Sequence, residues 1–314
     1  MAAEDASVKL FLFQDSRITS SFSGGVAVDQ ILPLCGYGRR LYSRGFGLAV
    51  VDAGRLQRVM VVGSSSTTLL DLGGMGMEMQ LSIAARPEAV SFDPSRTAVM
   101  VIDMQNDFGC RGGMFDRAGL DVAPIAHLVQ PISRLLEAAR RNALLIVYTR
   151  QEHNADLSDA GTEDAPHRIK HKRLNIGAAV VAPNGIQSQI LVRDTWNTAI
   201  IPELEPQPGD AVISKHRYSA FFETSLDTLL RARRINTLIF TGATTSICVE
   251  STVRDATFRD YRCIVLRDCT AELIAADTMR SNHEASLLAI ELLFGWTAES
   301  EAVIDALSRS AKAG

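Results

Sequence analysis

From about Arg86 onward, short apolar runs alternate with longer stretches in which apolar residues recur three and four positions apart. The short runs predict buried strands, and the longer stretches predict amphipathic helices. Strands hydrophobic along nearly their whole length are typical of a parallel sheet covered on both faces. The predicted strands are 98–102, 144–148, 211–214, 237–241 and 263–266. We therefore predict a three-layer α/β/α fold for residues 85–308, with a tail at 309–314.

The predicted helices between these strands each carry one apolar stripe. They cover 132–139, 226–230 and 249–256, and are followed by a late helix through Leu287 and Ile290 and a C-terminal helix through 303–307. Nearly every predicted strand is thus followed by a helix, as expected of repeated strand–helix–strand units.

Residues 1–84 differ in composition from the rest of the chain. They are rich in Gly and Ser, show no helical period, and contain short strand-like runs at 48–51 and 59–62. We expect an N-terminal extension and consider two hypotheses for it. In the first hypothesis, translation starts further along, near Met75, Met77 or Met79. An intact mass beginning at Met1 would refute this hypothesis. Alternatively, the extension is a small β-rich appendage that modulates assembly or access.

Composition excludes several classes of protein. The chain has 314 residues, a formal net charge of −4 and no long run of Lys and Arg, so we expect no nucleic-acid partner. Its five cysteines are scattered without paired spacing, which argues against a disulfide framework and favours the cytoplasm. No run is long enough to span a membrane, and the first residues lack a secretion signal. A small-molecule partner is therefore expected.

Three chemically versatile residues stand at or just after predicted strands: Asp103, Lys215 and Cys248. The carboxyl ends of parallel strands share one edge, where ligands bind, so we expect these side chains to meet. Taken one at a time, such residues usually have structural roles. A Cys packs in the core, an Asp caps a helix or turn, and a Lys lies on the solvated surface. Only their convergence favours catalysis.

The chemistry of such a group follows from its residue types. A helix N-terminus and the ammonium of Lys215 would lower the pKa of the Cys248 thiol. The carboxylate of Asp103 would accept the thiol proton and return it to a leaving nitrogen. Free backbone N–H groups in the turn 242–247 would stabilise a tetrahedral oxyanion.

The segments 97–108, 214–222 and 241–252 resemble, in order and spacing, the three catalytic segments of isochorismatase-like cysteine hydrolases. The resemblance covers about residues 85–308 and implies that Asp103, Lys215 and Cys248 form the catalytic triad. It also implies a cis peptide between Ala243 and Thr244, which would complete an oxyanion hole. Related enzymes are dimers or tetramers, so a homo-oligomer is expected. Because isochorismatases proper do not use this cysteine, its presence favours amide or ureide cleavage.

The remaining segments bear on the substrate. Residues 85–94, 217–222 and 293–296 resemble ureidoacrylate amidohydrolases, whereas 149–158 resembles biuret hydrolases. We therefore expect hydrolysis of a small linear amide or ureide, ureidoacrylate-like first, through a thioacyl-enzyme that releases ammonia or an amine. A biuret or N-carbamoyl substrate is the alternative, followed by a nicotinamidase-like amide. In a different class, the chain is a redox-responsive or binding module.

Nicotinamidases hold a metal with an Asp-x-His pair and a second His further on. Here Gln151 stands at the Asp position, so His153 lacks its carboxylate partner, although His167 and His171 follow. Basic residues that would repel a cation lie among them: Arg168, Lys170 and Lys172. We interpret this stretch as a polar surface loop and predict no metal and no cofactor.

Six further residues are candidates for contact with the substrate: Gln105, Asn106, Arg150, His153, Tyr218 and Phe222. Arg150 could pair with a substrate carboxylate, although exposed arginines usually face water. Tyr218 and Phe222 could wall an apolar pocket, although core packing is the commoner fate of such aromatics.

Overall fold

The computed structural model describes residues 80–274 and 281–313, together with four strands between residues 40 and 71. The chain divides into two compact units, Met1–Met77 and Glu78–Gly314. In the first unit the strands form an antiparallel sheet in the order β1-β2-β3-β4. Their bounds are β1 Arg40–Ser43, β2 Phe46–Val50, β3 Arg58–Gly63 and β4 Thr67–Asp71. The strand-like run at 59–62 falls on β3, and residues 48–50 of the other run fall on β2, while Val51 lies outside the described residues.

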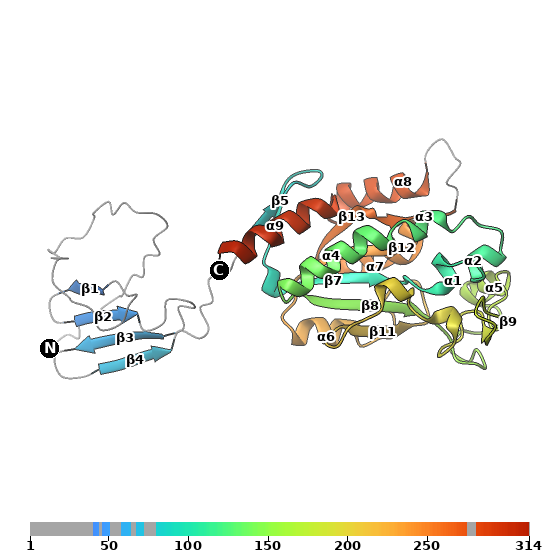
Figure 1. The fold of residues 1–314 in the computed structure, drawn as a ribbon, viewed down its shortest axis with the longest axis horizontal. Helices are drawn as coiled ribbons and strands as arrows, with labels where there is room; N and C mark the ends of the chain where they lie inside the picture. The colour runs from blue at the N-terminus through green and yellow to red at the C-terminus, as the bar shows by residue number, and fades with distance from the viewer. Residues whose placement is uncertain are drawn as a thin grey trace. The chain divides into compact units, whose positions relative to one another are not determined.

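A six-stranded parallel sheet forms the centre of the second unit, in the order β11-β8-β7-β12-β13-β14 (Figure 1). Its strands are β7 Thr97–Ile102, β8 Leu145–Gln151, β11 Ala211–Lys215, β12 Thr237–Ala243, β13 Arg262–Ala271 and β14 Trp296–Ala298. The predicted fold class is confirmed, and all five predicted strands are present. β14 was not predicted, because a strand of three residues is too short to show a period.

Helices cover both faces of this sheet. Val99 and Val101 of β7 pack on the side of α4 (Val129–Arg141) and α9 (Ser300–Ala313). The alternate residues Ala98, Met100 and Ile102 pack against the helices of the other face. Those helices are α6 Leu226–Ala232, α7 Glu250–Thr257 and α8 Asn282–Ala289. Burial of both faces explains why β7 is apolar at nearly every position.

A hairpin precedes the sheet. β5 (Leu81–Ile83) pairs with β6 (Val90–Phe92), and Ile83 and Phe92 are buried in the core shared by α4 and α9. Residues 81–84 therefore belong to the second unit, whereas the sequence suggested a boundary after residue 84.

Short elements complete this unit, many of them around the carboxyl edge of the sheet. The strands are β9 Ala179–Val181 and β10 Gln187–Gln189; the helices are α1 Asn106–Gly109, α2 Met114–Arg117, α3 Ala123–Ala126 and α5 Pro166–Lys172. Single turns of 3₁₀ helix are η1 Pro94–Arg96, η2 Trp196–Thr198 and η3 Pro202–Leu204, and π-helical turns are η4 Thr245–Val249 and η5 Ile290–Phe294. In residues 80–274 and 281–313, no helix is long and apolar enough to cross a bilayer.

Gly242 allows an unusually close approach between β7 and β12. Its φ is +107°, and a Cβ at this position would lie 2.0 Å from the backbone oxygen of Ile102. Only glycine fits a backbone this close with a positive φ. The contact brings the end of β7 and the end of β12 together.

Candidate active site

The side chains of Asp103, Lys215 and Cys248 meet at the carboxyl edge of the parallel sheet. Asp103 follows β7, Lys215 is the last residue of β11, and Cys248 lies in the π-helical turn η4 after β12. The Lys215 Nζ lies 2.6 Å from Asp103 Oδ2 and 3.6 Å from Cys248 Sγ. Asp103 and Lys215 are fully buried, and Cys248 is 6% exposed. The topology thus brings together the three residues that the sequence singled out.

Lys215 is held in place by three oxygens. Besides Asp103, its ammonium donates to Gln151 Oε1 at 2.9 Å and to the Arg217 backbone oxygen at 3.1 Å. The ammonium also donates to Cys248 Sγ, so its three N–H groups and its ion pair with Asp103 together fix its position. Burial alone would lower the pKa of Lys215, but the Asp103 carboxylate and the contact with Cys248 outweigh it and the pKa is raised. Lys215 therefore acts as a fixed positive charge.

Asp103 is also fixed on both oxygens. The Thr149 hydroxyl donates to Asp103 Oδ1 at 2.6 Å, while Oδ2 faces Lys215. The Asp103 backbone N–H donates to Thr149 Oγ1, and its φ is +50°, a conformation that costs a non-glycine residue roughly 1–2 kcal/mol. With this backbone conformation, the Asp103 carboxylate lies 2.6 Å from the Lys215 ammonium.

The thiol of Cys248 is not acidic in the resting site. Burial raises the pKa of Cys248 well above its ordinary value; Lys215 opposes this shift and Asp103 adds to it. We had expected Lys215 to lower the pKa, but desolvation of a fully enclosed thiolate is the larger effect. The nucleophile must therefore be formed by proton transfer during the reaction.

We predict that Cys248 reacts slowly with iodoacetamide at pH 7 and that the rate rises about tenfold per pH unit through pH 9, because only the thiolate reacts. Peptide mass spectrometry of timed samples measures this rate, and the Cys248→Ala variant provides the blank. A rate that levels off below pH 8 would mean a low-pKa thiol and would contradict the raised pKa.

The loop that carries Cys248 is anchored by Glu272. Its Oε2 accepts from the Ser246 N–H at 2.9 Å and from the Ser246 hydroxyl at 2.6 Å. Its Oε1 accepts from the N–H groups of Leu273 and Ile274 at 2.9 and 3.0 Å. The peptide bond between Ala243 and Thr244, in the same loop, is cis. Glu272 thus ties the nucleophile loop to the segment after β13.

We expect Glu272→Gln to lower kcat about tenfold or more, because an amide has one acceptor oxygen and cannot hold Ser246 and the 273–274 N–H groups together. The free energy of unfolding should fall by only about 1–2 kcal/mol. Steady-state kinetics and urea unfolding measure both effects. Glu301→Gln is the matched control, since Glu301 pairs with Arg134 on the surface. An unchanged kcat in Glu272→Gln would remove this positioning role.

A pocket of about 210 Å³ opens onto Cys248. Its lining is mostly apolar and includes Phe108, Met114, Phe115, Leu174, Ile247 and Ile274. The residues with polar groups in the lining are Gln151, Lys170, His171, Tyr218, Thr244 and Cys248. A small, largely apolar molecule that carries a polar group fits this lining.

Sequence comparison shows the family to which this chain belongs. The isochorismatase domain family matches residues 97–302, which is more than half of the chain and includes Asp103, Lys215 and Cys248. The chain belongs to the isochorismatase family. The resemblance stated from the three motifs is therefore confirmed at the level of the family.

Solved structures show the same relationship to the isochorismatase family. A cysteine hydrolase from Pseudomonas syringae pv. phaseolicola 1448A is 34% identical, with a TM-score of 0.59, over 70% of this chain and 95% of that one. An isochorismatase family protein from Desulfovibrio vulgaris subsp. vulgaris str. Hildenborough is 29% identical, with a TM-score of 0.54, over 68% and 99%. An N-carbamoylsarcosine amidase from Thermoplasma acidophilum is 26% identical, with a TM-score of 0.49, over 66% and 97%. The chain is a hydrolase of this family.

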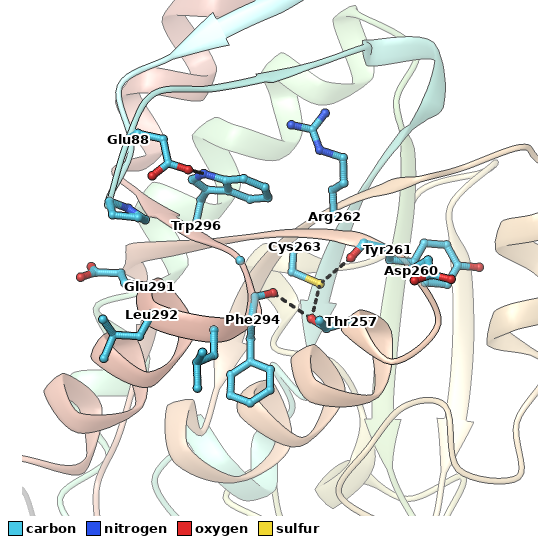
Figure 2. Close-up of a pocket in the computed structure, with 13 residues that line it drawn as sticks. Glu88, Thr257, Asp260, Tyr261, Arg262, Cys263, Glu291, Leu292, Phe294 and Trp296 are labelled. Carbon is cyan, nitrogen blue, oxygen red and sulfur yellow. Dashed lines mark hydrogen bonds between the residues drawn. The ribbon is translucent and has the colours of Figure 1, made fainter.

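A larger hollow of about 630 Å³ in this isochorismatase-family hydrolase does not contain the triad (Figure 2). It lies between Trp296 and Phe294 and includes a different cysteine, Cys263, which contacts the Thr257 hydroxyl at 3.6 Å. Burial raises the pKa of Cys263 to about 12. The smaller pocket at Cys248 is therefore the candidate active site.

Of the six predicted substrate contacts, Tyr218 lines the pocket and the other five do not. Gln105 uses its amide to clamp the main chain of Gln151 in both directions. Asn106 donates to the Trp196 backbone oxygen. The side-chain amides of these two residues therefore hold the neighbouring backbone in place and do not face the pocket.

The other predicted contacts turn elsewhere. Arg150 lies 3.6 Å from Glu152, in an ion pair. Phe222 is 42% exposed and lies beneath the Arg217 guanidinium. His153 is buried away from the pocket lining, where its Nδ1 meets Asp159 Oδ1 at 3.1 Å.

Gln151 is a pocket residue that sequence reasoning missed. Its Oε1 accepts from Lys215, which orients the amide, and its buried Nε2 has no hydrogen-bond partner among the described residues. A donor of this kind beside Cys248 suits a carbonyl or carboxylate oxygen of a substrate. Its place in the sequence, where nicotinamidases have an Asp, was the available signal.

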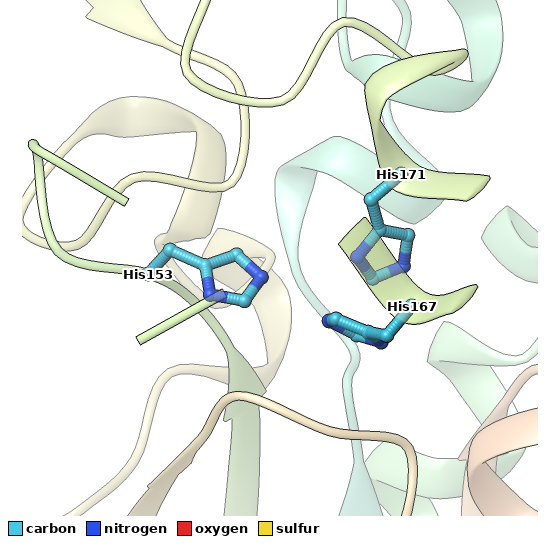
Figure 3. A group of neighbouring side chains, drawn as sticks. All are labelled: His153, His167 and His171. Carbon is cyan, nitrogen blue, oxygen red and sulfur yellow. The ribbon is translucent and has the colours of Figure 1, made fainter. Parts of the chain in front are cut away.

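The interpretation of 153–171 as a polar surface loop was wrong for its three histidines and for the stretch from Pro166, which forms α5. His153, His167 and His171 are all buried, at 0%, 8% and 7% exposure, and their rings face one another (Figure 3). Burial lowers the pKa of His167 to about 2 and of His171 to about 3. One ring nitrogen from each lies within 4.8 Å of the others. This arrangement can hold a metal and therefore argues against the prediction of none.

Proposed function

We propose that this hydrolase is a cysteine amidohydrolase that cleaves a C–N bond of a small linear amide or ureide. The observation that carries the proposal is the placement of the Lys215 ammonium 2.6 Å from Asp103 and 3.6 Å from the sulfur of Cys248, which lines a pocket. A base, a fixed positive charge and a nucleophile are the groups that acyl transfer needs.

In the proposed reaction, Asp103 takes the proton of Cys248 as the sulfur attacks the substrate carbonyl carbon. The C=O π electrons move to oxygen, and we assign the oxyanion to the N–H groups of Thr244 and Cys248. Asp103 then gives its proton to the leaving nitrogen, the C–N bond breaks, and a thioacyl-enzyme remains. Asp103 next deprotonates a water, which displaces the sulfur and regenerates the thiol.

Lys215 stabilises the charges that form during these reaction steps without exchanging a proton. Its ammonium forms an ion pair with Asp103 and donates to Gln151 Oε1, to the Arg217 backbone oxygen and to the Cys248 sulfur, and its raised pKa keeps it charged. The positive charge compensates for the thiolate when it forms, while Asp103 is neutral. Each intermediate therefore carries a compensated charge.

We infer that the substrate has an acidic end, because Lys170 is among the residues that line the pocket and the Gln151 amide offers a donor. A ureidoacrylate-like compound provides a carboxylate and a ureide carbonyl for these groups, whereas biuret has no charged end. A ureide of a small unsaturated acid is therefore our first candidate, and biuret or another N-carbamoyl compound is the alternative.

The test is ammonia release from ureidoacrylate, biuret, N-carbamoyl amino acids and nicotinamide, with Cys248→Ala measured in parallel. Release that the substitution abolishes supports the amidohydrolase and identifies its substrate class. No release from any compound by folded wild-type enzyme would reject the proposal. A redox role is disfavoured by the raised pKa of Cys248, since sensor thiols are acidic and accessible.

We also propose that the N-terminal sheet, β1–β4, is a β-rich appendage that modulates assembly or access to the site. Four antiparallel strands in a compact unit of their own support this over a mere linker. Light scattering and kinetics of the full chain and of a variant lacking residues 1–77 test it. Identical oligomer size and activity in both proteins would count against it.

A further inference from the structure

We propose that His153, His167 and His171 form a binding site for one late first-row divalent metal ion such as Zn²⁺, with a fourth coordination position open toward the Cys248 pocket. This inference goes beyond the proposed amide hydrolysis and does not depend on it.

Two elements bring the three imidazoles together. His153 lies just after β8, and His167 and His171 lie on α5, four positions apart and so on one face of the helix. The ring centroids are 4.0 Å apart for His167 and His171, and 5.6 and 6.0 Å from each of these to His153. Figure 3 shows His153 facing the other two rings across a shared space. Nitrogens bound tetrahedrally to one ion stand roughly 3.3 Å apart, so small rotations of these rings would close the site.

The ring nitrogens in this cluster lack partners. His153 Nε2, both nitrogens of His167 and His171 Nδ1 are buried and accept or donate no hydrogen bond among the described residues. Leaving a buried polar atom unpaired costs about 1–3 kcal/mol. Several such atoms around one point indicate that something outside the chain completes them. A metal ion would bind a lone pair from each ring.

The carboxylate of Asp159 orients the His153 ring for metal binding. Its Oδ1 lies 3.1 Å from His153 Nδ1. An N–H at Nδ1 donating to this carboxylate leaves the lone pair on Nε2, directed toward the other two rings. Asp159 is itself held by the Asn154 N–H and by Arg193. A carboxylate that orients a histidine from behind is the usual surrounding of a metal ligand.

The ligand set and its charged neighbours select the class of metal. Three imidazoles without a carboxylate ligand suit Zn²⁺, Co²⁺, Ni²⁺ or Cu²⁺ and do not suit Mg²⁺ or Ca²⁺. Arg168 turns away, donating to backbone oxygens of Leu157 and Gly161 and to Glu163. Lys215 and Arg217 are close enough to act on these rings, so a bound dication favours an anionic fourth ligand.

The fourth ligand has a route from the active site. His171 lines the 210 Å³ pocket beside Tyr218 and Cys248, and the Tyr218 ring packs edge-on against His167 and His171. Water, hydroxide or a polar atom of the substrate can therefore reach the open position.

The experiment is metal binding by the full-length protein, stripped with a chelator and equilibrated with Zn²⁺ or Co²⁺. We expect about one ion per chain by elemental analysis, and intense visible bands with Co²⁺ that mark a site with four ligands. His167→Gln and His171→Gln should each abolish both signals. Asp159→Asn should weaken binding about 10–100-fold. His127→Gln, at an exposed histidine, is the matched control and should bind like wild type.

Circular dichroism of every variant separates loss of the site from loss of the fold. Cys248→Ala should bind metal normally, because the thiol is not a ligand. The proposal is overturned if folded wild-type protein takes up no ion at micromolar free Zn²⁺, or if His167→Gln and His171→Gln retain wild-type binding. Since no turnover is measured, either result stands whether or not the protein hydrolyses ureides.

Discussion

Replacing Cys248 with alanine is expected to lower kcat by at least ~10⁴-fold while leaving the protein folded. The thiol is the only nucleophile that we assign to the pocket, and losing one member of a group that acts as a unit costs nearly as much as losing all of it. The stability cost should be about 1 kcal/mol, because alanine removes a single heavy atom from a packed site. Ammonia release on the best substrate of the panel measures the first effect, and urea unfolding measures the second.

Cys263→Ala is the matched control. Cys263 is also buried and lines the larger hollow, away from Asp103 and Lys215. We expect this variant to keep activity within about twofold and to lose a similar amount of stability. If Cys248→Ala retained more than about a tenth of wild-type turnover, another group would have to be the nucleophile and the covalent mechanism would be rejected.

Lys215→Met is expected to destabilise the protein by about 3–5 kcal/mol, because it removes one member of a fully buried ion pair. Methionine is close to lysine in length and fills the space, so the loss comes from the carboxylate of Asp103, which is left without its counter-charge. The Gln151 and Arg217 oxygens also lose their donor. Urea unfolding measures the change, read as a shift of the midpoint at constant slope.

The double variant Asp103→Asn with Lys215→Met distinguishes charge from packing. Without either charge, the stability should recover most of the loss, since an apolar replacement of a buried pair is often nearly neutral. Activity should stay abolished, because Asp103 is the proposed base. A Lys215→Met protein within about 1 kcal/mol of wild type, or a double variant no more stable than the single one, would contradict a charged pair at this site.

Much of the fold and the centre of the site followed from the sequence. Strands such as β7 are apolar on both faces, and a parallel sheet sends the residue after each strand to the same edge. That rule alone placed Asp103, Lys215 and Cys248 together. The hairpin β5–β6 and the strand β14 escaped because each strand has three residues, fewer than two full periods of alternation.

The substrate wall could not be predicted in the same way. Gln105 and Asn106 follow the first catalytic strand, yet their amides are used to hold neighbouring loops. Which polar side chain faces the pocket depends on contacts between segments 40 or more residues apart, which leave no periodic signal. The histidines of α5 show the same limit: their basic neighbours led to the prediction of a polar surface loop, whereas the rings turn inward against Tyr218.

Gly242 has a consequence for anyone who sets out to alter this enzyme by directed evolution. The strand that leads to the base and the strand that leads to the nucleophile touch through a missing side chain, since a single added carbon would collide with the Ile102 backbone. A mutational library should therefore leave position 242 unchanged, whatever residue is introduced elsewhere. The apolar residues Ile247 and Ile274 line the pocket without such a constraint and are the positions where new substrate shapes can be sought.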